Sequence, residues 1–260
     1  MVWNGTTPTV LTGEGGTQSY AFSINASGQV AGGSYTSGNA AEHAVVWNGT
    51  MPTVLTGEGG TYSSAYGINA SGQAVGYSQN SGNTANDAVV WNGTAPTVLT
   101  GLGGTGSVAY GINASGQVAG YSYTAGNAAT DAVVWNGTTP TNLGTLGGTQ
   151  SYAFSINASG QVVGNSETAG NASDDGFLYT GGAIYDLNSI VAPGSGVTDI
   201  EVNTDISDSI NDSGQIAAYG TYDGQTVALL LTPTPEPSAT MLLLGSGLMW
   251  MAKRRRSSVL

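Results

Sequence analysis

The sequence predicts an all-β fold, a β-propeller of about five four-stranded blades in which each blade is one repeat of 44 residues. The period is marked by tryptophans at regular positions, Trp3, Trp47, Trp91 and Trp135. Each repeat contains two β-hairpin signals, and no repeat shows the periodicity of a helix. Four short antiparallel strands in ~40–50 residues are typical of one propeller blade.

The first hairpin supplies the last two strands of a blade. Asn48 and Gly49 stand between two β-rich runs, and Asn-Gly favours a two-residue type I′ turn because both central residues need a positive φ. A proline begins the following run in each copy, which suits an outermost strand, where a missing N–H group is tolerated. These prolines are Pro8, Pro52, Pro96 and Pro140.

The second hairpin surrounds an Asn-Ala-Ser-Gly turn. In residues 64–78, two runs of alternating pattern flank this turn, and Gly72 suits its left-handed position. A parallel β-helix or solenoid is the alternative fold. Parallel strands are not joined by two-residue turns, so the hairpin signals favour the propeller.

A divergent fifth copy follows the four regular ones. Residues 177–187 replace the tryptophan hairpin and place Gly181 and Gly182 at its turn. Residues 208–220 repeat the second hairpin, and the insertion at 188–205 predicts a longer loop before it. Residues 226–231 predict one last strand.

The sequence begins inside a repeat, because Met1 occupies the position that Val45 has in the next copy. One interpretation is a closed ring of five blades in which Val10 and Leu11 complete the last blade beside residues 228–231. Such closure removes an exposed sheet edge. The other interpretation is that further blades precede Met1.

The charges divide the chain into an acidic body and a basic end. All four Lys and Arg residues lie at 253–256, and the 16 Asp and Glu residues precede them. A body without cations does not neutralise phosphates, which excludes nucleic acid as a partner. There are no cysteines, which excludes disulfides and thiolate metal sites.

The residue types of the body argue against an enzyme. His43 is the only histidine, Asp87 and Asp131 replace it in other copies, and the body has no Cys or Lys to act as a nucleophile. No cofactor is predicted, although an acidic cluster in the fifth copy has the carboxylates that calcium sites favour. Solvated loop carboxylates are the simpler interpretation of this cluster. Its members are Asp199, Glu201, Asp205, Asp208 and Asp212.

Aromatic residues recur in one part of the repeat. Periodic aromatics of this kind usually fill the space between blades, and the alternative is a surface on which sugars stack. The residues are Tyr20, Tyr66, Tyr110, Tyr152, Phe22 and Phe154.

The C-terminal end has the pattern of a membrane segment. Residues 238–252 carry no charge and many Leu and Met. A spanning helix needs ~20 apolar residues, so this run is short, and flanking cations extend its reach. The positive-inside rule then keeps the basic cluster in the cytoplasm and the body outside. The chain divides into a repeat domain (1–232), a linker (233–238) and an apolar transmembrane helix with a basic tail (239–256).

Pro235, Glu236 and Pro237 precede the apolar run, and Arg254, Arg255 and Arg256 follow it. In the order and spacing of these parts, this end resembles the PEP-CTERM sorting signal of Gram-negative, biofilm-forming bacteria. The resemblance implies export, recognition by the membrane protease exosortase, and transfer to the cell surface or the exopolysaccharide matrix. Export requires a signal peptide, and residues 1–10 lack its basic and apolar regions, so we expect a misplaced start or a fragment. The sorting residues are Pro235, Glu236, Pro237, Arg254, Arg255 and Arg256.

The repeats resemble the HAF-repeat family through His43-Ala44-Val45 and through residues 143–149, 156–164 and 175–177. This family is described as extracellular repeat proteins with no assigned activity. The resemblances predict an exported protein with a structural or binding role, whose partners are exosortase and surface or matrix components such as exopolysaccharide. The alternative is a secreted carbohydrate-binding or carbohydrate-active propeller that uses carboxylates and Tyr.

Overall fold

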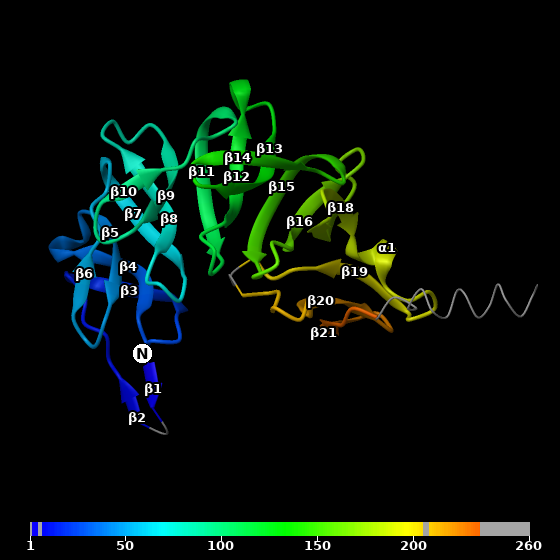
Figure 1. Cartoon of the computed structure of the whole chain (residues 1–260), viewed down its shortest axis with the longest axis horizontal. Coiled ribbons are helices and arrows are strands. Elements are labelled where there is room, and N and C mark those ends of the chain that lie inside the picture. Colours follow the sequence, from blue (N-terminus) through cyan, green and yellow to red (C-terminus); the bar gives the residue numbers. More distant parts are fainter. Residues whose placement is uncertain (1, 5–6, 205–207, 235–260) are drawn as a thin grey trace, which may run out of the picture.

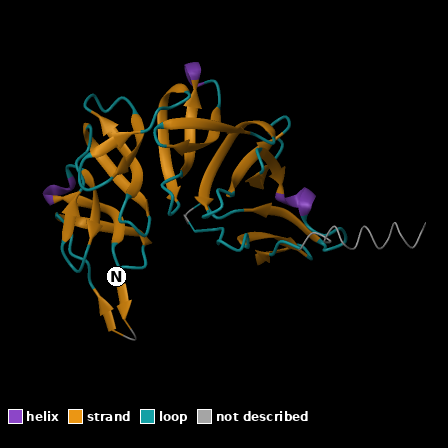
Figure 2. Ribbon diagram, viewed as in Figure 1, coloured by secondary structure: helices purple, strands orange, loops and turns teal. Residues whose placement is uncertain are grey.

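The computed structural model describes residues 2–4, 7–204 and 208–234, and it confirms the predicted all-β fold (Figure 1; Figure 2). Four four-stranded antiparallel sheets, here called blades 1 to 4, follow one another along an open arc. Among the described strands, neighbouring blades share only single parallel residue pairs, such as Gly106 with Asn86. The antiparallel pairing within each blade rules out the parallel β-helix.

The strands of each blade pair in chain order, from the inner strand to the outer strand. Blade 1 consists of β3 (Gly15–Ile24), β4 (Val30–Thr36), β5 (Glu42–Trp47) and β6 (Pro52–Val54). Blade 2 consists of β7 (Gly59–Ile68), β8 (Ala74–Asn80), β9 (Asn86–Trp91) and β10 (Pro96–Val98). Blade 3 consists of β11 (Gly103–Ile112), β12 (Val118–Thr124), β13 (Thr130–Asn136) and β14 (Thr139–Gly144). Blade 4 consists of β15 (Gly147–Ile156), β16 (Val162–Thr168), β17 (Asp174–Thr180) and β18 (Ala183–Asp186).

The fifth copy forms a three-stranded sheet, here called the terminal sheet, and the first residues form a separate hairpin. The insertion at 188–205 is more than the predicted loop, because it contains most of a helical turn and the first strand of the terminal sheet. The terminal sheet consists of β19 (Val197–Glu201), β20 (Ile216–Tyr222) and β21 (Gln225–Leu231). The remaining elements are β1 (Val2–Asn4), β2 (Thr7–Thr9), α1 (Leu187–Ile190) and the short 3-10 turns η1 (Ser37–Asn39) and η2 (Ala125–Asn127).

The predicted closure by strand sharing is wrong. Among the described strands, β1 pairs with β2 alone and β21 pairs with β20 alone, so Val10 and Leu11 do not join residues 228–231. Leu11 packs against the buried core of blade 1, and the Thr12 N–H donates to the Thr50 carbonyl at 2.8 Å. These contacts hold the segment after β2 on blade 1, at the opposite end of the arc from β21 (Figure 1).

Both predicted hairpins are present, but one turn differs. Trp47 pairs with Pro52, so four residues connect β5 to β6, and only Gly49 of the Asn-Gly pair has a positive φ. The type I′ prediction is therefore wrong here. It fits Gly181 and Gly182 in blade 4, whose φ angles are 61° and 84°. The predicted left-handed glycine of the second hairpin is confirmed at Gly72, with φ 82°.

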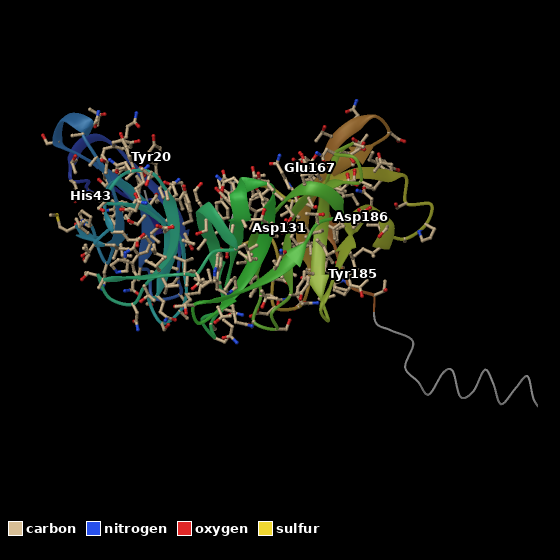
Figure 3. The ribbon with its side chains drawn as sticks, turned by 90° about the horizontal axis from the view of Figure 1, so that it is seen from above. Tyr20, His43, Asp131, Glu167, Tyr185 and Asp186 are labelled. Carbon is tan, nitrogen blue, oxygen red and sulfur yellow. The ribbon has the colours of Figure 1, made fainter. Side chains whose placement is uncertain are left out.

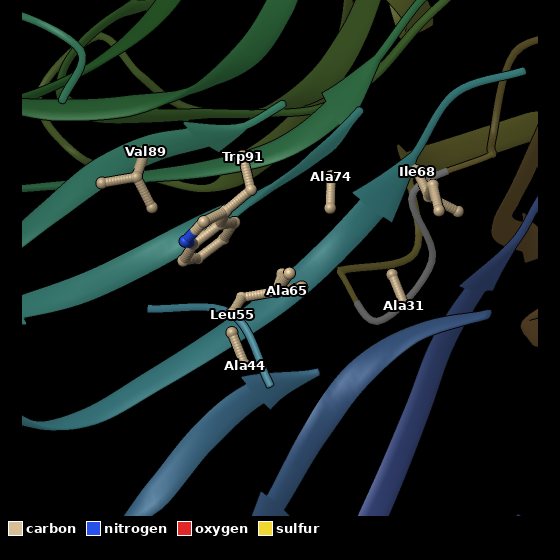
Figure 4. Close-up of a cluster of buried hydrophobic side chains, with 8 residues drawn as sticks. All are labelled: Ala31, Ala44, Leu55, Ala65, Ile68, Ala74, Val89 and Trp91. Atoms are coloured by element: carbon tan, nitrogen blue, oxygen red, sulfur yellow. The ribbon is translucent and has the colours of Figure 1, made fainter. Parts of the chain in front are cut away.

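The core lies between blades. Each blade has a forward face, which packs on the next blade in chain order, and a backward face, which packs on the preceding one. Ala31 and Ala44 on the forward face of blade 1 meet Ala65, Ile68 and Trp91 on the backward face of blade 2 (Figure 4). The same arrangement recurs between blades 2 and 3 and between blades 3 and 4.

The repeated tryptophans occupy equivalent environments, as the period predicts. Trp47, Trp91 and Trp135 are at most 1% exposed. Each indole N–H donates to the carbonyl of the threonine that follows the preceding outer strand, at 2.8, 2.9 and 2.8 Å. The tryptophan therefore joins each blade to the segment that enters it.

Within the described ranges, no helix is long and apolar enough to cross a membrane. The predicted apolar helix and basic tail at 239–256 lie outside the described residues.

Candidate functional site

A ladder of asparagines joins successive second hairpins. Asn25, Asn69 and Asn113 each donate through Nδ2 to the backbone carbonyl of the equivalent asparagine in the next blade, at 3.0, 3.2 and 3.0 Å. Asn157 donates in the same way to Asn211 at 3.0 Å. Each Oδ1 accepts from the backbone N–H groups of its own turn, for example from residues 71 and 73. The Asn of this motif therefore serves the fold.

Serine hydroxyls of the repeat also accept hydrogen bonds from backbone N–H groups, both between blades and within a blade. The Ser63 hydroxyl accepts from the Ala44 N–H of the preceding blade at 2.9 Å, and Ser107 accepts from Ala88 at the same distance. Ser78 accepts from the Glu58 N–H at 2.9 Å. A hydroxyl held in this way satisfies a buried donor, so these serines are structural residues and not candidate nucleophiles.

His43 pairs with a carboxylate at the N-terminal end of the arc. Its Nδ1 lies 3.2 Å from both carboxylate oxygens of Glu14. Among the described residues, no Ser or Thr hydroxyl hydrogen-bonds to the His43 ring. Figure 3 shows His43 at one end of the arc and Asp131 at its middle, so the ring stands apart from that carboxylate. The arrangement is a histidine–carboxylate pair, and within the described residues it lacks the hydroxyl nucleophile of a triad.

Two carboxyl groups occupy the equivalent positions in blade 2. Burial, and then the negative charge of Asp87, raise the pKa of Glu58. Burial raises the pKa of Asp87, an effect that its hydrogen bond with Glu58 partly offsets. Each of the two carboxyl groups therefore lies where burial disfavours its charged form.

In the acidic cluster of the fifth copy, described members such as Glu201 and Asp212 have partners within the protein. The Tyr219 hydroxyl donates to Glu201 at 2.6 Å, and the Ala158 N–H donates to Asp212 at 2.9 Å. Asp205 lies outside the described residues. Over the part of the chain that the structure describes, no three His, Cys, Asp or Glu side chains could hold a metal ion together.

The predicted aromatic repeat is a ladder of rings across the inner strands. Ring centroids are 5.1 Å apart for Phe22 and Tyr66, 5.3 Å for Tyr66 and Tyr110, and 5.4 Å for Tyr110 and Phe154. Burial raises the pKa values of the Tyr66 and Tyr110 hydroxyls. The interpretation of these rings as packing between blades is correct for the inner rungs, whereas Phe22 at the N-terminal end is 42% exposed.

Tyr20 and Tyr152 lie two residues earlier in the inner strand, and their rings stack on the ladder at Phe22 and Phe154, with centroids 6.1 and 6.4 Å apart. Each hydroxyl donates to a glutamine two residues earlier, at 2.6 Å. Tyr20 is exposed at the N-terminal end of the arc (Figure 3). Tyr152 and Tyr123 line a cleft of about 260 Å³ between blades 3 and 4, which is smaller than the ~300–1,000 Å³ of typical ligand pockets.

A half-buried carboxyl between blades 1 and 2 departs from the pattern of the other regular copies. Gly33 replaces the Tyr77 and Tyr121 of the next two blades, and a Cβ at Gly33 would lie 2.2 Å from the Glu42 carboxylate. Glu42 therefore fills space that a tyrosine occupies elsewhere. Burial raises the pKa of Glu42, while the hydroxyls of Tyr35 and Ser64 beside it act in the opposite direction.

This Glu42 site combines a carboxyl, hydroxyls and tyrosine rings. Burial and the nearby Glu42 charge raise the pKa of Tyr77 to about 12. The Glu42 carboxyl can accept hydrogen bonds from a polar molecule, as the hydroxyls of Tyr35 and Ser64 beside it show. The site was not predicted from the sequence, although an alignment of the copies shows that Gly33 and Glu42 differ from the residues at the same positions in the other copies.

We expect the free energy of unfolding to fall as pH rises from about 4 to 7, because several carboxyl groups have a higher pKa in the folded chain than in the unfolded chain. Burial raises the pKa of Glu42, Glu58, Asp87 and Asp175, so the folded chain binds more protons than the unfolded chain in this window. Glu42→Gln should be more stable than the wild type near neutral pH, with the difference shrinking on acidification. Thermal unfolding in a pH series tests this, and a wild-type Tm that rises with pH would contradict it.

The comparisons with known proteins identify no family. No protein-family model and no curated protein matches the chain. Among solved structures, the chain is similar to the β-propeller domain of the Trilobed protease from Pyrococcus furiosus, with 9% identity, 83% coverage of each chain and a TM-score of 0.34. The predicted sorting residues at 235–237 and 254–256 lie outside the described residues.

Proposed function

We propose that this chain is an exported, non-enzymatic repeat protein of the cell surface or exopolysaccharide matrix, delivered by an exosortase-type sorting tail. The observation that carries the proposal is the order of the C-terminal sequence. Pro235, Glu236 and Pro237 precede an uncharged run at 238–252, and the four cations of the chain follow at 253–256. An apolar run near the lower length limit for a spanning helix suits a transient anchor, and the cations set its orientation.

The described part of the chain supports a role without catalysis. The repeated Asn and Ser side chains hold blades together, and His43 is paired with Glu14. The formal net charge of −12 favours solubility outside the cell and disfavours binding to anionic polymers without a divalent cation. A repeated rigid scaffold presents the same surface several times, which suits a structural or binding component of a matrix.

We expect the mature protein to lose the residues that follow the Pro235 to Pro237 region in a host that carries exosortase. Mass spectrometry of the surface and secreted fractions should find a chain that ends near this region. Glu236→Gln should leave an uncleaved, membrane-bound form, because the protease no longer meets its acidic recognition residue. Asp174→Asn is the matched control, since Asp174 is an exposed acid on blade 4, and it should be processed like the wild type.

A host without exosortase gives the second comparison, since the wild type should stay uncleaved there. Replacing Arg254, Arg255 and Arg256 with serine should impair membrane orientation and reduce the processed form. Intact residues 241–256 on the extracellular protein would contradict exosortase sorting and indicate a permanent anchor.

A further inference from the structure

The forward face of the terminal sheet is exposed where the same positions in the blades are buried. Strand register makes Ala217 equivalent to Ala31 and Ala228 equivalent to Ala44. Both residues of blade 1 are 0% exposed, whereas both residues of the terminal sheet are exposed. Leu230, which pairs with Ala217, is 68% exposed.

The backward face of blade 1 shows the complementary exposure at the other end of the arc. Ile24 is 54% exposed, whereas its equivalent in blade 2, Ile68, is 7% exposed. Ser19 and Ala21 are also exposed, although the residues at their positions in blades 2 to 4 are buried.

These two faces carry the residues that already bind each other inside the chain. At the junction of blades 1 and 2, Ala31 and Ala44 pack in one cluster with Ala65 and Ile68. The Ala44 N–H donates to the Ser63 hydroxyl at 2.9 Å, and the same bond recurs at the next two junctions at 2.9 and 2.7 Å. The exposed pair at the ends, Ala228 and Ser19, is the equivalent of this pair.

The series of asparagine hydrogen bonds also has two ends, one in blade 1 and one in the terminal sheet. Asn25 begins it and Asn211 ends it among the described residues, with Asn211 Nδ2 donating to Gln215 within its own turn at 2.9 Å. The next acceptor in the series would be the carbonyl of Asn25. The two ends thus match in apolar surface and in hydrogen-bonding groups.

We propose that two copies of this chain associate head to tail, with the forward face of the terminal sheet of one copy packed on the backward face of blade 1 of another. The occupant is a second copy because the interface continues the blade-on-blade packing that this sequence repeats three times. Figure 1 shows the two faces at opposite ends of the arc. A heterologous contact of this kind builds closed rings or filaments. This inference does not depend on the proposed sorting.

Disulfide trapping tests the contact, because the chain contains no cysteine. Full-length Ser19→Cys and Ala228→Cys, made separately and mixed under oxidising conditions, should form a covalent heterodimer, because the equivalent internal residues Ser63 and Ala44 are hydrogen-bonded neighbours. Ser81→Cys, at an exposed loop of blade 2, replaces Ser19→Cys in the matched control and should give little cross-linking. The double variant Ala88→Cys and Ser107→Cys in one chain should form an internal disulfide.

Sedimentation velocity gives an independent measure. Wild-type chain should associate with increasing concentration, and more strongly at higher salt because like charges are screened. Leu230→Asp should abolish that association without lowering Tm, since Leu230 is exposed in the single chain. Association through the apolar tail would survive Leu230→Asp, and the mixture of Ser19→Cys with Ala228→Cys would then give no covalent heterodimer.

Each of three results from the experiments above would overturn the proposal. They are a wild type that stays monomeric at its highest soluble concentration, a mixture that forms no heterodimer above the Ser81→Cys control, and association that Leu230→Asp leaves unchanged. A single chain carrying both Ser19→Cys and Ala228→Cys that forms only a monomeric internal disulfide would also overturn it, in favour of closure within one chain.

Discussion

Trp91→Ala should lower the free energy of unfolding by about 3–5 kcal/mol. The side chain is 0% exposed and lies in the cluster between blades 1 and 2 (Figure 4). Truncation leaves a cavity and also leaves the Thr56 carbonyl without the indole donor that binds it at 2.9 Å. Urea unfolding followed by far-ultraviolet circular dichroism measures the loss.

Two further variants separate the causes. Trp91→Phe keeps most of the apolar volume and removes the donor, so it should lose less stability than Trp91→Ala. Met51→Ala, at a residue that is 68% exposed, should change the free energy of unfolding by less than about 0.5 kcal/mol. A similar small change for Trp91→Ala would contradict the placement of this ring in the core.

The local elements were predictable because the repeat carries its own pairing signals. The equivalence of Trp47, Trp91 and Trp135 followed from the period alone, and the Asn-Ala-Ser-Gly turn from one glycine. The Asn-Gly turn was misassigned because Asn48 stays at a negative φ when four residues join the strands. Gly181 and Gly182 adopt the predicted geometry in blade 4, where only two residues intervene.

Closure was not predictable from strand identity. The repeat pattern shows that β2 is an outer strand and that no outer strand follows β21 in its sheet. It does not show whether β2 and β21 belong to the same sheet. Leu11 and Thr12 decide this, because they bind blade 1 as their equivalents Leu55 and Thr56 bind blade 2. The same packing of blade on blade leaves the backward face of blade 1 and the forward face of the terminal sheet exposed at the two ends of the arc.

The Glu42 site was hidden for a different reason. The 44-residue period shows what the copies share, whereas this site depends on two differences between the copies that act together. Loss of the tyrosine at Gly33 makes room, and Glu42 occupies it from the next strand. A pairwise comparison of facing positions across the copies would have found the exchange. The order of the tail, in contrast, is legible only in the sequence.

Gly120→Ala should lower the free energy of unfolding by about 1–3 kcal/mol, because it overpacks the blade interior. A Cβ at this position would lie 2.0 Å from the Val108 carbonyl oxygen and 3.0 Å from the Trp135 ring. The backbone of β11 cannot rotate away as a flexible side chain can, so the two strands must separate. Gly32, Gly76 and Gly164 meet the same obstacle in the other blades, at 1.9 Å from a carbonyl oxygen.

Gly82→Ala is the matched control for this prediction. Gly82 has no positive φ, and the nearest atom to an added Cβ is 3.6 Å away. The methyl group should therefore be neutral or slightly stabilising, because alanine reduces the conformational entropy of the unfolded chain. Urea unfolding of both variants decides the matter. Equal stabilities would show that the blades have room at Gly120, and the glycine that recurs after each Ala-Ser-Gly-Gln segment would then need another explanation than close strand packing.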